Sequence, residues 1–319
     1  MLKKARILYS DMKKLVTGGS GFIGSHLVRK LCQQGHEVAV LSRDSNPKAL
    51  EGVCEKVEII KFDFNNFSDH KIFKEVDAVY HLAWSSLPRN NTSNLILDLN
   101  TSVVWSIKLI EECIKNNVKK FIFASSGGAI YGQSQRGELI SEYLHPKPIS
   151  KYGIAKLFVE QYLHYFKHHH NFDFVIARIS NAYGERPRIN QSQGVVSVWL
   201  NSIINNEPIK LYGDGLQVRD YIHVDDVVES LSLLNNKIAN NEVYNIGSSQ
   251  GLNLIQLLEI IKSELQVDVD VNQIAYNAND VSYNVLNTEK IRNHLNWKAK
   301  VSIREGISKT YDYLNSIRV

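Results

Sequence analysis

The chain has 319 residues, 44% of them hydrophobic and 22% charged, which excludes a mainly disordered or fibrous protein. Its 37 basic and 33 acidic residues leave a net charge of +4 without a basic block, so we expect no nucleic-acid partner. No run of about 18 apolar residues is present, so we expect no membrane-spanning helix and no membrane partner. Three scattered cysteines without metal-ligand spacing fit a reducing compartment, and we expect a cytoplasmic protein.

Strand patterns alternate with helix patterns along most of the chain. Short apolar runs predict strands at 13–16, 37–41, 57–62, 77–82, 119–124, 172–179 and 243–246. Apolar residues at helical spacing predict helices at 22–35, 95–115, 150–168, 195–205, 224–235, 254–265 and 288–295. This alternation predicts the α/β class, with a doubly wound parallel sheet that helices cover on both faces.

A glycine turn lies between the first predicted strand and the first predicted helix. Gly18, Gly21 and Gly24 are spaced G-x-x-G-x-x-G. Such glycines allow a tight turn and let backbone N–H groups approach a pyrophosphate, and the helix N-terminus, with Phe22 and Ile23, favours the anion. A purely structural turn is the alternative. The strand before the glycines and the helix after them favour a dinucleotide site.

The residues after the second predicted strand bear on the choice between NAD and NADP. A carboxylate there suits the ribose 2′-hydroxyl of NAD, whereas an arginine suits the 2′-phosphate of NADP. Ser42 and Arg43 occupy these positions, and Asp44 follows them. We expect Ser42 and Arg43 to contact the cofactor, and the sequence leaves NADP open beside NAD.

Composition and pattern divide the chain into three parts. Residues 1–11 are expected to be an N-terminal extension outside the core, and residues 12–180 to form an NAD(P)-binding Rossmann domain. Segments near 219–246 should return to that domain. Residues 181–319, rich in Asn, Gly and Pro at their start, should form a smaller α/β C-terminal substrate lobe. No linker separates the lobes, so we expect the substrate to bind between them.

Tyr152 and Lys156 lie four residues apart in a predicted helix, so their side chains share a face. A tyrosine with a pKa near 10 is a poor base at neutral pH, and a nearby ammonium would lower that pKa. The pair could take a proton from a sugar hydroxyl while a nicotinamide takes the hydride. Two unrelated surface side chains are the alternative. The glycine turn upstream and Ser125-Ser126 at a strand end favour catalysis.

Taken together, the motifs resemble the extended short-chain dehydrogenase/reductases of the NAD-dependent epimerase/dehydratase group, most closely UDP-sugar 4-epimerases of the UDP-glucose 4-epimerase type. The resemblance runs from residue 12 to about residue 313. The segments that carry it are 17–24, 80–83, 125–132, 152–156, 178–184, 213–215 and 218–226. It implies an NAD-dependent enzyme with a nucleotide-sugar substrate, and a homodimer formed through helices 95–115 and 150–168.

The resemblance also implies roles for matching residues. Tyr152 would be the acid/base, and Lys156 would hold the cofactor ribose and tune the tyrosine. Further cofactor contacts are implied for Asp63 and Phe64 near the adenine and for Leu82 and Ala83 beside the nicotinamide. Substrate contacts are implied for Asn181 and Arg219 at the diphosphate and for Asp280, since a guanidinium meets phosphate oxygens bidentately.

The chain departs from the resembled pattern at several positions. Counted back from Tyr131, the usual catalytic hydroxyl falls on Gly127, so we expect Ser126 to replace it and to contact the substrate. An arginine of the usual substrate site falls on Asn277. The pair Gly127-Gly128 offers no carboxylate, which argues against a sugar 4,6-dehydratase, because eliminating water needs an acid and a base.

Two other features are interpreted as structural. His164 and the histidines at 168–170 fit a solvated helix end, so we expect no metal site. Trp84 is expected to be a packing residue, although it adjoins the nicotinamide side.

These inferences lead to one preferred function and two alternatives. The preferred function is a nucleotide-sugar 4-epimerase for a UDP-hexose or UDP-N-acetylhexosamine, acting through a transient 4-keto sugar with bound NAD. Ser42-Arg43 favour an NAD(P)H-dependent 4-ketosugar reductase. The missing hydroxyl at position 127 favours a non-catalytic Rossmann module that senses cofactor.

Overall fold

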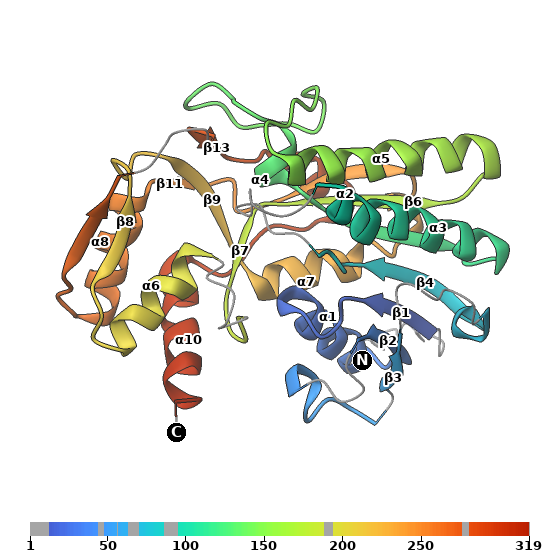
Figure 1. The fold of residues 1–319 in the computed structure, drawn as a ribbon, viewed down its shortest axis with the longest axis horizontal. Coiled ribbons are helices and arrows are strands. Elements are labelled where there is room, and N and C mark those ends of the chain that lie inside the picture. The colour runs from blue at the N-terminus through green and yellow to red at the C-terminus, as the bar shows by residue number, and fades with distance from the viewer. Residues whose placement is uncertain are drawn as a thin grey trace, which may run out of the picture.

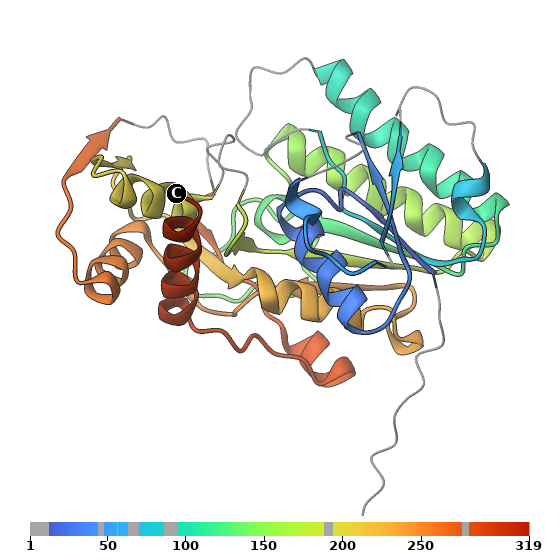
Figure 2. The same ribbon diagram turned by 90° about the horizontal axis from the view of Figure 1, so that it is seen from below.

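The computed structural model describes residues 13–43, 48–55, 57–62, 70–85, 95–187, 194–275 and 281–318. A larger lobe is built on a seven-stranded sheet, and a smaller lobe packs against one end of it (Figures 1 and 2). The strands of the large sheet are β1 (Lys13–Thr17), β2 (Val38–Ser42), β3 (Val57–Lys61), β4 (Val76–His81), β5 (Lys120–Ser126), β6 (Phe174–Ile179) and β10 (Glu242–Ile246).

The large sheet is parallel throughout, in the order β3-β2-β1-β4-β5-β6-β10. The chain order reverses between β1 and β4, because β2 and β3 lie on one side of β1 and the later strands on the other. In such sheets ligands bind outside the carboxyl ends of the strands at this point. The predicted doubly wound α/β fold is confirmed.

Helices cover both faces of the large sheet (Figure 1). One face carries α1 (Phe22–Gln33), α7 (Val224–Leu233) and α9 (Glu289–Leu295), and the other carries α2 (Leu95–Asp98), α3 (Trp105–Lys115) and α5 (Lys151–His170). Side chains of successive strand residues point to opposite faces. Leu15 therefore enters one core and Val16 the other, and both are fully buried. This explains why the strands appear in the sequence as continuous apolar runs.

The predicted helix at 95–115 is interrupted. A π-helical segment, Leu99–Val104, separates α2 from α3. The hydroxyl of Thr101 donates to the Leu97 carbonyl at 2.8 Å, and that of Ser106 donates to the Ser102 carbonyl at 2.5 Å. Hydroxyls that bond to carbonyls one turn back compete with the helical ladder and bend it, which accounts for the difference.

The smaller lobe has two small sheets and three longer helices. In one sheet β9 (Val218–His223) pairs with β7 (Asn181–Tyr183), β11 (Gly251–Leu252) and β13 (Tyr283–Asn284); in the other β8 (Ile209–Tyr212) pairs with β12 (Val271–Ile274). The helices are α6 (Val195–Ile204), α8 (Leu254–Leu265) and α10 (Ile303–Ser316), which share a core around Trp199. The remaining short helices are Lys48–Leu50, His70–Phe73, α4 (Gly127–Ile130) and Lys237–Ala239.

Segments of the chain after residue 180 contribute to both lobes. β10 pairs with β6 at the edge of the large sheet, whereas β9 belongs to the smaller lobe. Within the described part of the chain, no helix has both the length and the apolar character that crossing a bilayer requires.

Candidate active site

The glycine turn joins β1 to α1 at the carboxyl end of the sheet. Gly18 has a φ of +72°, and a Cβ on it would lie 2.6 Å from the backbone nitrogen of Ala83. A Cβ on Gly24 would lie 2.1 Å from the Gly18 carbonyl oxygen, so only glycines fit both positions. Gly21 begins α1 without a side-chain cap, and the first turn has no acidic residue. The N–H groups at Phe22 and beyond are therefore suited to an anion.

Leu82 and Ala83, which follow β4, lie directly against the end of β1. The Leu82 N–H donates to the Thr17 carbonyl at 3.1 Å, and the Ala83 N–H donates to the Thr17 hydroxyl at 3.3 Å. Ser42 is buried at the end of β2, and Arg43 is exposed beside it. The structure thus brings most predicted cofactor residues to one edge of the sheet. Asp63 and Phe64 lie outside the described residues, as do Asp280 and Asn277 on the substrate side.

Tyr152 lies in the first turn of α5 and is hydrogen-bonded to Ser126 at the end of β5. The hydroxyl of Ser150 caps the helix by accepting a bond from the Gly153 N–H at 3.1 Å. Burial raises the pKa of Tyr152 to about 12, and the bond to Ser126 acts in the opposite direction. Lys156 is not among the groups that lower the pKa of this phenol.

Lys156 is buried and points past the phenol toward β5. Its ammonium donates to the Ala124 carbonyl at 2.7 Å and lies 3.7 Å from the ring centroid of Trp84. Burial holds the pKa of Lys156 well below its usual value, while the carboxylate of Glu160 acts to raise it. The Lys156 nitrogen is 5.8 Å from the centroid of the Tyr152 ring. The predicted pair therefore shares one face of α5, and each side chain has its own partner on β5.

A buried polar network, which the sequence analysis missed, lies behind this pair. The Ser125 hydroxyl donates to Glu160 Oε1 at 2.5 Å, and Arg178 binds the same carboxylate through Nη2 at 2.7 Å and Nε at 3.2 Å. Arg178 also donates to the Tyr131 hydroxyl at 2.9 Å, and the Glu160 carboxylate helps to raise the pKa of Arg178 against burial. A charged residue inside the apolar strand Phe174–Ile179 was the signal that could have revealed it.

Gly127 and Gly128 differ sharply in the space around them. A Cβ on Gly127 would lie 2.5 Å from Leu286 Cδ1, so any side chain there would require Leu286 to move. A Cβ on Gly128 would meet nothing closer than the Asn181 amide and the Ser126 hydroxyl, each at 3.9 Å. The position at which the resembled family has its hydroxyl, Gly127, is therefore a packing position in this chain. The neighbouring hydroxyl is that of Ser126, at the end of β5.

Asn181 and Arg219 come from neighbouring strands of the smaller lobe. β7 pairs with β9, and the Asn181 amide donates to the Asp220 carbonyl at 3.1 Å. The amide thereby borders the space beside Gly128 and Ser126. Arg219 is half-buried on β9. Asp220 is buried and accepts bonds from two nearby loops; burial raises its pKa to about 6.

Among the described residues, one group of His and carboxylates has the spacing to hold a metal ion: Glu185, His223 and Asp225. His223 Nδ1 accepts a bond from the Asp225 N–H at 3.3 Å and caps α7, and His223 Nε2 lies 3.2 Å from Glu185 Oε2. His223 Nδ1 therefore has a hydrogen-bond partner, whereas Nε2 faces the Glu185 carboxylate without a hydrogen bond. This arrangement explains the cluster as a junction between α7 and the loop after β7.

The geometry agrees with comparisons to known proteins. The profile of the NAD dependent epimerase/dehydratase family matches residues 14–247. The chain is 33% identical to a putative UDP-glucose 4-epimerase of Methanocaldococcus jannaschii, over 95% of this chain and 98% of the relative. It is 30% identical to a dTDP-4-dehydro-6-deoxyglucose reductase of Escherichia coli, over 92% of this chain and 95% of the relative.

A solved structure extends this likeness to the fold. The UDP-glucose 4-epimerase of Thermotoga maritima, crystallised with UDP-glucose, superposes with a TM-score of 0.88 at 34% identity, over 96% of this chain and 99% of that one. The chain therefore belongs to the NAD dependent epimerase/dehydratase family, and it is an NAD-dependent enzyme with the nucleotide-sugar chemistry of that family.

Proposed function

We propose that the protein is a nucleotide-sugar 4-epimerase that acts on a UDP-hexose or UDP-N-acetylhexosamine. The observation that carries the proposal is the hydrogen bond between Tyr152 and Ser126 at the carboxyl end of β5, beside the glycine turn. A phenol and a hydroxyl in contact can pass a proton to and from the 4-hydroxyl of a sugar. The likeness to a UDP-glucose 4-epimerase crystallised with UDP-glucose supports this substrate class.

The glycine turn fits NAD. Gly18 and Gly24 leave room only for backbone, and the uncapped N-terminus of α1 faces the same edge of the sheet. The N–H groups of Phe22, Ile23 and Gly24 would hold the pyrophosphate, since that of Gly21 donates to the Gly18 carbonyl, and Ser42 and Arg43 would lie at the adenosine ribose. Leu82 and Ala83 would line the nicotinamide side, and Lys156 would bind its ribose. When bound, NAD supplies a hydride acceptor that later returns the hydride.

Side chains of the protein would carry out the proton transfers of the reaction. Tyr152 would remove the proton of the sugar 4-hydroxyl, directly or through Ser126, and would return it after the 4-keto sugar has turned over. A phenol with a pKa near 12 is too weakly acidic for this role at neutral pH, so positive charge from Lys156 has to act on it in the working complex. Arg219 and Asn181 would hold the diphosphate while the sugar turns, which keeps binding energy on the part that does not react.

The test is incubation of the purified protein with UDP-glucose and with UDP-N-acetylglucosamine, without added cofactor. One of the two should equilibrate with its 4-epimer. Tyr152→Phe should slow the reaction about a hundredfold or more, because acid–base groups contribute at least that factor. Tyr143→Phe is the matched control, since Tyr143 is 87% exposed and its ring lies beside Lys290. The proposal fails if neither sugar is converted.

A 4-ketosugar reductase is the second candidate, and two observations favour it. The E. coli relative is a dTDP-4-dehydro-6-deoxyglucose reductase, and Arg43 is exposed where a 2′-phosphate of NADP would lie. A reductase would consume reduced cofactor in stoichiometric amounts, whereas an epimerase would not. Mass spectrometry of cofactor released by denaturation separates the two: co-purified NAD supports the epimerase.

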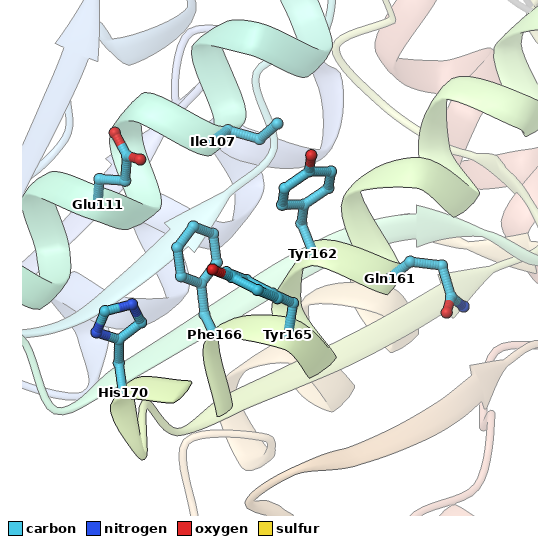
Figure 3. A pocket seen from close by; sticks show the side chains of 7 residues that line it. All are labelled: Ile107, Glu111, Gln161, Tyr162, Tyr165, Phe166 and His170. Atoms are coloured by element: carbon cyan, nitrogen blue, oxygen red, sulfur yellow. The ribbon is translucent and has the colours of Figure 1, made fainter. Parts of the chain in front are cut away.

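We also propose a homodimer through α3 and α5. A groove of about 470 Å³ lies on their outer face (Figure 3), and its lining residues are Ile107, Glu111, Gln161, Tyr162, Tyr165, Phe166 and His170. On α5, Ile154 and Phe158 lie one turn apart and are 53% and 49% exposed, so they form an apolar patch and not a single exposed side chain. Phe158→Glu should convert the dimer to a monomer in sedimentation equilibrium. Ile238→Glu, also at an exposed apolar residue but remote from the groove, should not.

A further inference from the structure

The ammonium of Lys156 lies among three aromatic rings. It is 3.7 Å from the centroid of Trp84, 4.7 Å from that of Phe123 and 5.8 Å from that of Tyr152. The rings come from three elements: the segment after β4, the middle of β5 and the first turn of α5. Trp84 also packs edge-on against the ring of Tyr152, with centroids 6.1 Å apart. Trp84 therefore contacts both residues of the predicted catalytic pair.

The charged groups around Lys156 do little to balance its charge. His81 faces it from β4, and burial together with Lys156 holds the pKa of His81 well below its usual value, so this ring is neutral. Glu160 lies one turn further along α5, but Arg178 from β6 binds both of its carboxylate oxygens. The negative charge of Glu160, the one acidic residue of α5, is thus largely balanced by Arg178 and not by Lys156.

A buried ammonium needs partners, because its transfer out of water is costly. The Ala124 carbonyl accepts one of its hydrogens at 2.7 Å. The face of an indole carries negative charge density and attracts a cation more strongly than a phenyl or phenol ring does. At 3.7 Å the Trp84 ring is well inside the range of about 6 Å over which this attraction acts.

We propose that Trp84 is a positioning residue, whose indole face keeps Lys156 charged and holds its ammonium beside Tyr152. The inference rests on the proposed roles of Tyr152 and Lys156. It adds a role to the packing that the sequence predicts for Trp84. Without the indole, Lys156 would lose its proton at a lower pH, and the phenol would lose the cation that makes it acidic.

Two substitutions separate the charge effect from packing. Trp84→Leu removes the aromatic face and keeps an apolar side chain, whereas Trp84→Phe keeps a ring face. The protonation of Lys156 is followed by ¹⁵Nζ NMR of lysine-labelled protein, and Lys156→Met identifies the signal. We expect Trp84→Leu to lower the pKa of Lys156 by about one unit, which is tenfold in the proton equilibrium, and Trp84→Phe to lower it less.

The activity profile gives a second readout. The alkaline limb of kcat against pH should move to lower pH by the same amount in Trp84→Leu, with partial rescue in Trp84→Phe. A merely structural role would lower kcat at every pH and leave that limb in place. An unchanged Lys156 titration in both variants would overturn the inference. An inactive wild-type protein would instead overturn the proposed function, because the NMR titration needs no substrate.

Discussion

Replacing Gly127 should destabilise the protein, even though the resemblance leads one to expect a hydroxyl at this position. A Cβ there would lie 2.5 Å and 3.1 Å from the two methyl carbons of Leu286 and 3.0 Å from the Arg178 carbonyl oxygen. Carbon atoms in good contact are about 3.5–4.0 Å apart, so neighbouring atoms have to move. Leu286 is fully buried against Tyr131 and Ile140, and the Arg178 carbonyl belongs to a central strand. Neither neighbour can yield freely.

The magnitude follows from two opposing effects. Overpacking of a well-filled core costs about 1–3 kcal/mol. Gly127 opens the short helix α4, and alanine is favoured over glycine in a helix by roughly 0.5–1 kcal/mol. The net expectation for Gly127→Ala is a loss of about 1–2 kcal/mol in the free energy of unfolding. Urea unfolding, followed by tryptophan fluorescence, measures this loss as a lower midpoint.

Two further variants make the test specific. Gly128→Ala is the matched control, because its Cβ would meet nothing closer than 3.9 Å, and its free energy of unfolding should stay within about 0.5 kcal/mol of the wild type. Leu286→Ala removes the obstructing methyl groups, so its cost should be smaller in the Gly127→Ala background than alone, with a coupling above about 0.5 kcal/mol. A Gly127→Ala protein as stable as the wild type, or strict additivity in the double variant, would contradict the packing argument.

Three other predictions follow from buried groups. Burial acts to raise the pKa of Glu185, but His223 and a backbone N–H outweigh it and hold the pKa at about 2. This value is below the usual 4.5, so ionised Glu185 stabilises the folded protein. The stabilisation is complete above pH 4.5 and is lost as the pH falls toward 2. The stability difference between the wild type and Glu185→Gln should therefore shrink over that range in acid unfolding. A disulfide reagent should label exposed Cys54 at once and buried Cys113 only after unfolding, as timed mass spectrometry would show. Asp220→Asn should lower the free energy of unfolding, measured in urea, by about 3 kcal/mol, because the new NH₂ group would face backbone N–H donors.

Long elements of the fold were predictable because their patterns are strong. The inner strands of the large sheet are buried on both faces and form apolar runs, whereas β3 at the edge is partly exposed. The helix α8 has the predicted bounds, Leu254–Leu265. A capping box between Asn253 and Gln256 marks the start of that helix. Strands of two or three residues, such as β11 and β13, are too short to leave a pattern. Their pairing with β9 depends on tertiary contacts instead.

The sequence predicted which residues form the site but not which side chains they contact. The spacing of Tyr152 and Lys156 predicted one shared face, and the structure has it. The sequence could not predict that Lys156 reaches the Trp84 ring, because the two residues are far apart in the chain. The same holds for Leu286, whose packing on Gly127 makes a side chain there unfavourable. Aligning a residue by its distance from a motif fails at Gly127, because the contact that limits the space there comes from Leu286, which is far away in the sequence.

A stripe along α5 and the end of β5 form one matched set of contacts. Tyr152, Lys156 and Glu160 are spaced by four residues and share a helix face. They contact three successive residues of β5: Tyr152 bonds to Ser126, Lys156 to the carbonyl of Ala124, and Glu160 to the hydroxyl of Ser125.

Buried ion pairs contribute little to stability on balance. The pair of Glu160 with Arg178 is therefore better explained as a contact that positions α5 on the sheet than as one that stabilises the fold. A carboxylate bound by both Arg178 and Ser125 fixes the rotation and the height of α5 against the sheet. Sliding the helix by one turn, about 5.4 Å, would break all three contacts at once. The placement of the phenol beside Ser126 thus depends on a charged residue two turns away, and this dependence is why the Tyr-Lys spacing alone does not define the site.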